Sequence, residues 1–405
     1  MGVLADQERT LIKSLLPLRR QRMSASPFAF FRGSAVIMAA DLATVPVTGL
    51  RVQACGDAHI GNFGMYGTPE RNVVFDLNDF DETLPGPWEW DVLRMATSLV
   101  LAARDLGLAD AAGGESVYGG VQAYRQAMLE YAAASPLTVW YDRIDLKRAV
   151  LTLPLPRRGV RRTLSKARKR TAEQLLPKLT GGSQPHFVDS PPTFQRIGLD
   201  SQTAEQARRV LKLYGKSLAP HLRRLFERFH LHDVAMKVVG IASVGTQCLV
   251  ALLLSEGGAP LLLQLKEARA SILERYVGRS VYRNHGERIG QGQRLMQAAS
   301  DIFLGWTATA GHDFYVRQLR DMKLAVHLQS VNAAQLSQYA KTCGRTLARP
   351  HARSGDPGAL AAYLGRGDAF EGAVVRFAQT YANLVDSDYD EFVRRARPDP
   401  PPGSQ

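Results

Sequence analysis

Two neighbouring stretches, CGDAHIGNFG at residues 55–64 and VVFDLNDFDE at residues 73–82, decide how the chain is interpreted. The first follows the short segment LRVQA and is rich in glycine, and the second is an apolar run that ends in acids. These patterns predict two strands, and the residues GMYGTPE between them are typical of a hairpin turn. We therefore expect two polar loops at the same end of two adjacent strands.

The polar side chains of these loops are of the types that hold a hard metal ion. Asp57, His59 and Asn62 stand in GDxHxxN spacing, and further acids follow after one predicted hairpin, namely Asp76, Asp79 and Asp81, with Asn78 among them. Carboxylate and amide oxygens are ligands that suit Mg²⁺. A second carboxylate beside such an ion can accept a proton from an attacking hydroxyl group. The combination is typical of phosphoryl transfer, in which catalysis is mostly positioning and charge neutralisation.

The order GDAHIGN, VVFDLNDFD and WEWDVLRMA resembles the catalytic half of the aminoglycoside phosphotransferase branch of the protein-kinase-like fold. This resemblance implies that Asp57 is the catalytic base and that Asn62 and Asp76 bind Mg²⁺. Asp79 is an alternative ligand, because it also precedes an apolar residue on the same predicted strand. The resemblance further implies that Asp91 is a buried structural acid.

A second resemblance extends over about residues 20–395. The segments SPFAFFRG, FDLNDFDETLPGPWEWD, QRLMQAASDIFLGW and YVRQLRDMK resemble those of the DUF2252 family of uncharacterised bacterial proteins. This likeness identifies relatives and implies little about activity. Cys55 departs from the phosphotransferase pattern, which usually has histidine there, and the departure affects a position that braces the loop.

The nucleotide-binding part is expected downstream of the acids, because only about fifty residues precede the GDxHxxN loop. VVGIASVGT predicts a glycine turn between strands, and LLLQLKEA predicts a strand that carries Lys266. Backbone N–H groups in such a turn can bind phosphates, and a strand lysine can reach their oxygens. The kinase-like resemblance therefore assigns Gly240, Ser243, Gly245 and Lys266 to nucleotide binding, with Glu287 as the ion-pair partner of the lysine.

Each of these downstream assignments has a structural alternative. Ala242 stands where a GxGxxG loop has its second glycine, so the turn is also compatible with an ordinary hairpin. Lys266 is alternatively an edge-strand lysine that points into water, although a lysine on an apolar strand is costly to bury unless it is paired. Glu267 and Glu274 are alternative partners for it.

The fold expected from these patterns is α+β, a protein-kinase-like two-lobed fold that is circularly permuted. The catalytic helical lobe comes first and the small antiparallel nucleotide lobe later. The expected boundaries are an N-terminal extension at 1–22, the catalytic lobe at 23–232, the nucleotide lobe at 233–325, C-terminal helices that complete the helical lobe at 326–396, and a flexible tail at 397–405.

Composition and charge limit the class of protein. The 405 residues are 45% hydrophobic and 22% charged, which is typical of a soluble globular chain. We find no apolar run of bilayer length, no secretion signal, and three cysteines that form no CxxC pair, so we expect a cytoplasmic enzyme without a membrane span. Much of the net charge of +13 lies in RRGVRRTLSKARKR at 157–170. Without interleaved aromatic residues this run does not favour nucleic acid, and it is interpreted as a solvated face or, alternatively, as a site for an acidic partner.

The function expected from the sequence is an ATP- and Mg²⁺-dependent phosphotransferase that acts on an unidentified acceptor, either a small molecule or a protein. A metal-dependent phosphohydrolase and a non-catalytic, nucleotide-binding kinase-like protein are the alternatives. The identity of the acceptor and the oligomeric state are left open.

Overall fold

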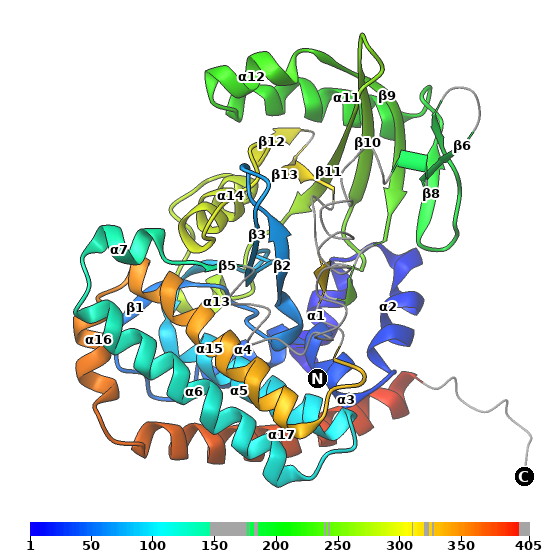
Figure 1. Cartoon of the computed structure of the whole chain (residues 1–405). Helices are drawn as coiled ribbons and strands as arrows, with labels where there is room; N and C mark the ends of the chain where they lie inside the picture. The colour runs from blue at the N-terminus through cyan, green and yellow to red at the C-terminus, as the bar shows by residue number, and fades with distance from the viewer. Residues whose placement is uncertain are drawn as a thin grey trace, which may run out of the picture.

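The computed structural model describes most of the chain, namely residues 1–145, 176–177, 179–181, 185–238, 240–241, 244–309, 311–319, 324–325 and 328–396. The fold is α+β: a helical body carries one small sheet, and a six-stranded antiparallel sheet lies beside it (Figure 1). The basic run 157–170, Ser243 and the tail 397–405 lie outside the described residues. In the part that is described, no helix is both long and apolar enough to cross a membrane.

The helical body combines helices from both halves of the sequence. It contains α3 (Pro27–Gly33), α4 (Ala35–Leu42), α5 (Trp88–Asp105), α6 (Asp110–Ala132), α7 (Pro136–Tyr141), α15 (Ala333–Ser354), α16 (Pro357–Leu364) and α17 (Ala369–Ala396). Gly344 of α15 lies directly on α6, where a Cβ atom would overlap the carbonyl group of Gly120, so glycine permits this close approach. Phe30 of α3 packs against Phe392 of α17 with ring centroids 5.1 Å apart. One hydrophobic core therefore joins the two ends of the chain.

Local sequence signals explain where several of these helices begin. Helices α3, α7 and α16 each start with proline at the first helical position, after Ser26, Ser135 and Asp356, whose side chains accept a hydrogen bond from the backbone. A polar cap followed by proline is a common start of a helix, because the cap satisfies a free N–H group and proline lacks one.

The small sheet has the strand order β14-β2-β3-β5, with β2 (Phe63–Gly67), β3 (Val73–Leu77), β5 (Ile144–Asp145) and β14 (Leu324–Ala325). The expected pairing of the two opening strands is wrong. Strand β1 (Arg51–Ala54) pairs with β4 (Leu84–Pro87), whereas β3 lies between β2 and β5. Residues 64–67 of β2 were predicted to be part of the turn. The turn itself is shorter and lies between Thr68 and Asn72, where the N–H of Thr68 donates to the carbonyl of Asn72 at 2.7 Å.

The six-stranded sheet has the order β12-β13-β11-β10-β9-β8 and is antiparallel throughout. Its strands are β8 (Phe194–Ile197), β9 (Phe229–Lys237), β10 (Cys248–Ser255), β11 (Pro260–Ala268), β12 (Gly305–Thr309) and β13 (His312–Gln318). The antiparallel sheet expected after residue 232 is present. Strand β8, which precedes that boundary, also belongs to this sheet, and α11 (Gln202–Tyr214) packs against it. Helices α12 (Pro220–Phe226), α13 (Glu274–Val277) and α14 (His285–Met296) and the short strands β6 (Thr180–Gly181) and β7 (His186–Phe187) complete this region.

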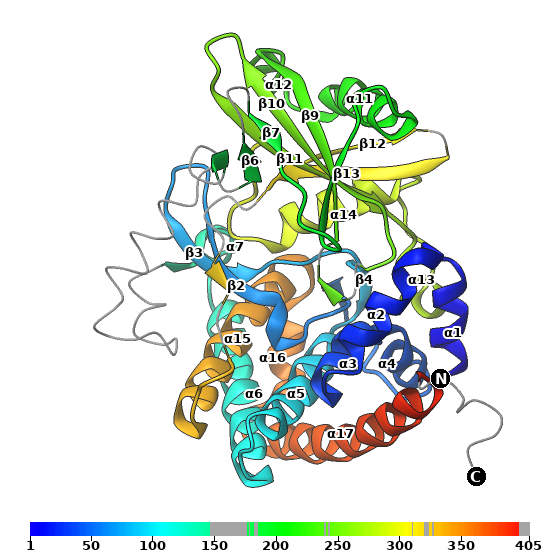
Figure 2. The ribbon, with the colours of Figure 1, turned by 90° about the vertical axis from the view of Figure 1, so that its right-hand side faces the viewer.

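The first 23 residues connect the helical body to the six-stranded sheet (Figure 2). They form α1 (Gly2–Arg9), the 3₁₀ turn η1 (Lys13–Leu15) and α2 (Leu16–Met23). The N–H of Ile12 donates to the carbonyl of Gly245 at 2.9 Å. The buried guanidinium group of Arg19 donates to the carbonyls of Gly33 at 2.6 Å and Ile241 at 3.1 Å. This segment therefore braces the turn between β9 and β10.

Candidate functional site

The loop after β1 is held in place by a buried acid on α5. Asp91, in the first turn of α5, accepts hydrogen bonds from the N–H groups of Cys55 at 2.6 Å and Gly56 at 2.9 Å, and lies 3.2 Å from His351. Gly56 has a φ of +80°, and a Cβ atom there would lie 2.6 Å from the carbonyl of Glu82. Glycine is therefore required at this position, and Asp91 has the structural position that the sequence implied.

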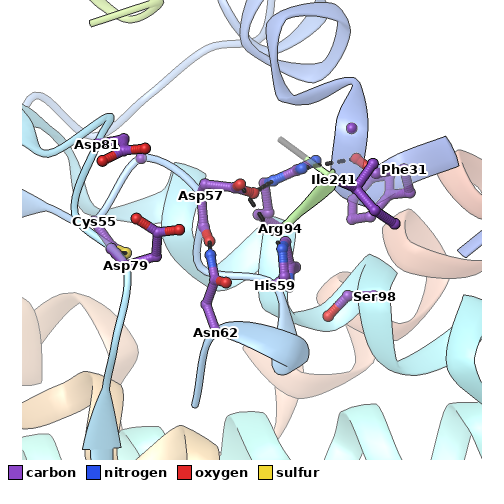
Figure 3. A network of polar contacts seen from close by, with 12 residues as sticks. Phe31, Cys55, Asp57, His59, Asn62, Asp79, Asp81, Arg94, Ser98 and Ile241 are labelled. Carbon is purple, nitrogen blue, oxygen red and sulfur yellow. Dashed lines mark hydrogen bonds and ion pairs between the residues drawn. The ribbon is translucent and has the colours of Figure 1, made fainter. Parts of the chain in front are cut away.

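Asp57 projects from this loop beside an arginine (Figure 3). Its Oδ1 accepts a hydrogen bond from Arg94 Nε at 2.6 Å, and its Oδ2 lies 3.8 Å from His59 Nε2. Burial raises the pKa of Asp57 above its ordinary value, although Arg94 acts in the opposite direction. Burial lowers the pKa of His59 well below its ordinary value, and Arg94 adds to this effect, so the imidazole is neutral. One oxygen of Asp57 is thus anchored while the other stays available.

The orientation of Asn62 is fixed by its hydrogen bond to the backbone of Asp57. Asn62 Nδ2 donates to this carbonyl at 2.7 Å (Figure 3). Because a carbonyl oxygen only accepts hydrogen bonds, the NH₂ group must face it and Oδ1 must point the other way. The amide oxygen is therefore presented on the side away from the Asp57 carbonyl.

Asp79 and Lys266 approach the loop from two other segments. Asp79 follows β3, and its Oδ1 is buried without a hydrogen-bond partner among the described residues. Lys266 lies on β11, is 2% exposed, and places Nζ 4.0 Å from Asp79 Oδ1 and in an ion pair with Asp81. Burial disfavours the charge of the lysine, but Asp79 and Asp81 outweigh it and raise the pKa of Lys266 well above its ordinary value. Lys266 is therefore a buried, paired lysine and not an edge-strand lysine in water.

The ion pair expected between Lys266 and Glu287 is not found among the described residues. Lys266 is paired with Asp81, whose other oxygen accepts a hydrogen bond from Tyr315 at 2.9 Å. On α14 the next residue, Arg288, contacts this loop instead and donates to the carbonyls of Thr83 and Asp81 at 2.6 and 2.7 Å. Tyr315 and Lys266 are directly opposite each other in the β11–β13 register, so both can reach the same carboxylate.

Asp76 lies in a different environment from Asp79. It is fully buried on β3, and both of its oxygens accept hydrogen bonds from Arg349 of α15, at 2.7 and 2.6 Å. The N–H groups of Leu77 and Ala298 also donate to it, at 2.9 and 2.7 Å. With both oxygens occupied, Asp76 is a structural ion-pair residue, and Asp79 becomes the better candidate for a metal ligand.

The acids line a cavity that the sequence did not predict. Its walls are Arg32, Gly33, Ala35, Asp57, Asp79, Asp81 and Glu82, with Gln7 and Arg19. A second cavity of about 380 Å³ is lined by Asp81 and Glu82 as well and extends between α1, β11 and Ile289 of α14.

The sequence contains a signal that Arg94 belongs to the site, because Arg94 follows Asp91 by three residues and so lies on the same helix face. Arg32 and Glu82 had none.

The glycine turn between β9 and β10 is described only in part. Gly245 is buried with a φ of +102°, and a Cβ atom there would lie 2.8 Å from Leu11 Cβ, so both the backbone and the packing call for glycine. Gly240 is exposed. Ser243 lies outside the described residues. The phosphate-binding role of this turn stays a prediction.

A Mg²⁺ ion at this site would need other ligands in addition to carboxylates. Among the described residues, no group of three or more His, Cys, Asp or Glu side chains could hold a metal ion. Mg²⁺ usually takes only one or two carboxylates and completes its shell with waters and substrate phosphates. The buried, unpartnered Oδ1 of Asp79 and the amide oxygen of Asn62 fit this more modest requirement.

Glu82 borders both cavities and has an unusual protonation behaviour. Its Oε2 accepts a hydrogen bond from the N–H of Ile272 at 2.7 Å. Burial nevertheless raises the pKa of Glu82 to about 7, because the ionised form loses hydration. The folded protein therefore binds a proton at Glu82 at pH values at which the unfolded chain has released it.

We expect Glu82→Gln to remove a pH-dependent loss of stability. Between pH 4.5 and 7 the folded state holds more protons than the unfolded state, so the wild-type free energy of unfolding falls as the pH rises, by about 3 kcal/mol in total. The glutamine keeps a carbonyl oxygen for Ile272 and carries no charge. Urea unfolding at pH 5 and pH 8 should show that the variant loses less stability between these pH values than wild type does. Parallel pH profiles for the two proteins would contradict the assignment.

The chain belongs to the family described as "Uncharacterized protein conserved in bacteria (DUF2252)", whose model matches residues 9–395. No curated protein and no solved structure matches the chain. The family resemblance seen in the sequence is therefore confirmed, and the resemblance to kinase-like enzymes stays a prediction.

Proposed function

We propose that the protein is an ATP- and Mg²⁺-dependent phosphotransferase. The observation that supports this most directly is that residues of three segments, one of them far along the chain from the other two, meet at one place. Asp57 and Asp79 line the same cavity, and Lys266 lies 4.0 Å from Asp79 although 187 residues separate them. A base, a metal-binding carboxylate and a phosphate-binding lysine are the groups that phosphoryl transfer needs close together.

The proposed ligands of Mg²⁺ are Asn62 and Asp79. They are hard oxygen donors. Asp79 Oδ1 is buried and has no hydrogen-bond partner in the described part of the chain, and Asn62 presents its oxygen away from the Asp57 carbonyl. When bound, Mg²⁺ would neutralise charge on the phosphates. Lys266 would contact phosphate oxygens of ATP, and the turn around Gly240, Ser243 and Gly245 would cover them with backbone N–H groups.

In the proposed reaction Asp57 is the general base. The acceptor hydroxyl group gives its proton to Asp57 as its oxygen forms a bond to the γ-phosphorus atom. The bond between that phosphorus and the β–γ bridging oxygen breaks, and ADP leaves with the electron pair. The raised pKa of Asp57 suits this role, since a base is most effective when its pKa is closer to the working pH.

We also propose that the fold is a circularly permuted kinase-like fold. In support, the antiparallel sheet that carries Lys266 follows the acidic loops in the chain and faces them in space. Helix α14 lies against this sheet, and α15 then returns to the helical body. Chain order does not determine an active site, which is defined by the positions and roles of its residues.

The cytoplasmic location stays a prediction.

The first test is thermal unfolding of wild type and Asp79→Asn with and without Mg²⁺-ATP. A ligand at 100 times its Kd should raise the free energy of unfolding of wild type by about 2.7 kcal/mol. We expect the increase to require Mg²⁺ and to be lost in Asp79→Asn. Asp105→Asn, at an exposed carboxylate that lines neither cavity, is the control and should respond like wild type. No increase in wild type would remove ATP from the proposal, and an increase retained by Asp79→Asn would remove Asp79 as a ligand.

Two alternatives predict different products when the protein is incubated with ATP. A metal-dependent phosphohydrolase would release inorganic phosphate and ADP from ATP without any acceptor. A non-catalytic nucleotide-binding protein would show the Mg²⁺-ATP stabilisation but no turnover with any acceptor. Product analysis of ATP incubated with the protein separates these alternatives from the transferase.

A further inference from the structure

An arginine that forms no ion pair with another described residue lies beside the proposed catalytic base. Arg32, in the last turn of α3, lines the cavity together with Asp57 and Asp79. Its Nε is buried without a hydrogen-bond partner, and its one aromatic contact among the described residues is the ring of Phe28, 5.8 Å from its Cζ. Burial lowers the pKa of Arg32, yet a guanidinium group stays charged at any physiological pH. Asp57 acts on this charge but forms no ion pair with it, so part of the cost of burying the charge remains, and a bound anion would lower that cost.

The other arginine of the cavity is already occupied. Arg19 donates to the carbonyls of Gly33, Ile241 and Val244, at 2.6, 3.1 and 3.4 Å, and so serves the packing of the turn. Gln7 resembles Arg32 instead, since its Oε1 is buried without a partner among the described residues and borders the same cavity. The wall of this cavity therefore contains a guanidinium nitrogen and an amide oxygen that have no hydrogen-bond partner among the described residues.

Arg32 lies on the Asp57 side of the site and Lys266 on the Asp79 side. A Cβ atom at Gly61 would lie 3.3 Å from Arg32 Nε, so Arg32 packs on the GDxHxxN loop itself. Asp57 is the carboxylate that acts on its charge. Phe31, the neighbour of Arg32, lies on one side of Asp57 in Figure 3, and Asp79 and Asp81 lie on the other. The lysine is thus placed for the nucleotide phosphates and the arginine for the molecule whose hydroxyl group meets Asp57.

We propose that Arg32 binds a negatively charged group of the acceptor, so that the acceptor is a small hydroxyl compound that carries a phosphate or carboxylate. This inference rests on the proposed phosphotransferase function. The guanidinium fork suits either group, because it can donate two parallel hydrogen bonds. Four acids, Asp57, Asp79, Asp81 and Glu82, line the same cavity, and Arg32 offsets the repulsion that they would exert on an anionic acceptor. Gln7 Oε1 would accept a hydrogen bond from a hydroxyl group of the acceptor.

The test separates anion binding from the phosphotransferase function. Binding of inorganic phosphate to the full chain, without nucleotide, is measured by titration calorimetry for wild type, Arg32→Gln, Lys266→Met and the exposed control Arg224→Gln. We expect Arg32→Gln to bind phosphate at least about tenfold more weakly, as the loss of a charge-assisted pair implies, while the control Arg224→Gln binds it as wild type does. Without phosphate, Arg32→Gln should be at least as stable as wild type, because it removes an unpaired charge. Unchanged phosphate binding in Arg32→Gln, or binding lost only in Lys266→Met, would overturn the proposal.

A second measurement tests the acceptor class directly. Matched hydroxyl compounds with and without a charged group, glycerol 3-phosphate, glycerate and glycerol, are incubated with the protein and Mg²⁺-ATP. We expect ADP formation to be at least about tenfold faster with a charged compound than with glycerol, and Arg32→Gln to lose that preference. Equal rates with all three would refute the acceptor class. No turnover with any of them, together with absent Mg²⁺-ATP binding, would count against the phosphotransferase function and leave the phosphate titration as the test of Arg32.

Discussion

Asp57→Asn is expected to slow phosphoryl transfer by about 10²–10⁴-fold, the usual contribution of a general base, while Mg²⁺-ATP binding stays within about twofold of wild type. Asparagine has nearly the same shape and can still accept the hydrogen bond from Arg94 Nε, but it cannot take up a proton. The rate is measured as ADP formation in the presence of an anionic acceptor, and nucleotide binding by thermal unfolding.

The controls for this variant separate chemistry from folding. Arg94 loses its negative partner, although its other nitrogen keeps a hydrogen bond to the Phe31 carbonyl at 2.9 Å, so unfolding of Asp57→Asn without ligand must be measured too. Asp105→Asn should transfer phosphate at the wild-type rate. A folded, nucleotide-binding Asp57→Asn protein that transfers phosphate normally would exclude Asp57 as the base.

Arg349→Met is expected to lower the free energy of unfolding by about 3–5 kcal/mol, the usual cost of leaving one member of a buried ion pair unpaired. Asp76 is fully buried and Arg349 is 2% exposed, so water cannot replace the lost partner. In the variant, the N–H groups of Leu77 and Ala298 still donate to the Asp76 carboxylate, but they satisfy only part of its hydrogen-bonding capacity. Urea unfolding followed by circular dichroism measures the change, with the slope m compared between variants to confirm the same transition.

The double variant Asp76→Asn/Arg349→Met is the matched control for this prediction. Removing both charges should restore at least half of the lost stability, because no buried charge is then left without a partner. The ion pair between Asp76 and Arg349 would not stabilise this part of the fold if Arg349→Met lost less than about 1 kcal/mol. The same would follow if the double variant were less stable than Arg349→Met.

Short-range patterns in the sequence predicted the parts of the site that depend on neighbouring residues. The GDxHxxN loop and the strand that carries Lys266 follow from local spacing and apolar runs, whereas the buried position of Asp91 was implied by the kinase-like resemblance. The sheet around Lys266 was predicted as antiparallel for the same reason, since its strands are joined by short glycine turns. Local signals therefore placed the candidate base, one ligand and the lysine.

The parts that were not predicted depend on partners far along the chain. Nothing near Asp76 in the sequence distinguishes it from Asp79, and the residue that does, Arg349, lies 273 positions away. The partner of Lys266 is Asp81, 185 positions before it, and not a glutamate on the next helix. The pairing of β1 with β4 instead of β3 has the same origin, because strand pairing is decided by the whole core and not by the nearest turn.

The long separations within the site also have a consequence for synthesis of the protein. Asp76 and Asp91 depend on Arg349 and His351 of α15, which follow them by 273 and 260 residues. At a translation rate of 5–20 residues per second, the acidic loops leave the ribosome roughly 15–50 s before their supporting helix exists. During that interval the nascent chain carries the acids without the groups that hold them in place. A ribosome that stalls before α15 would therefore release a chain in which the loops are present but the site is not assembled.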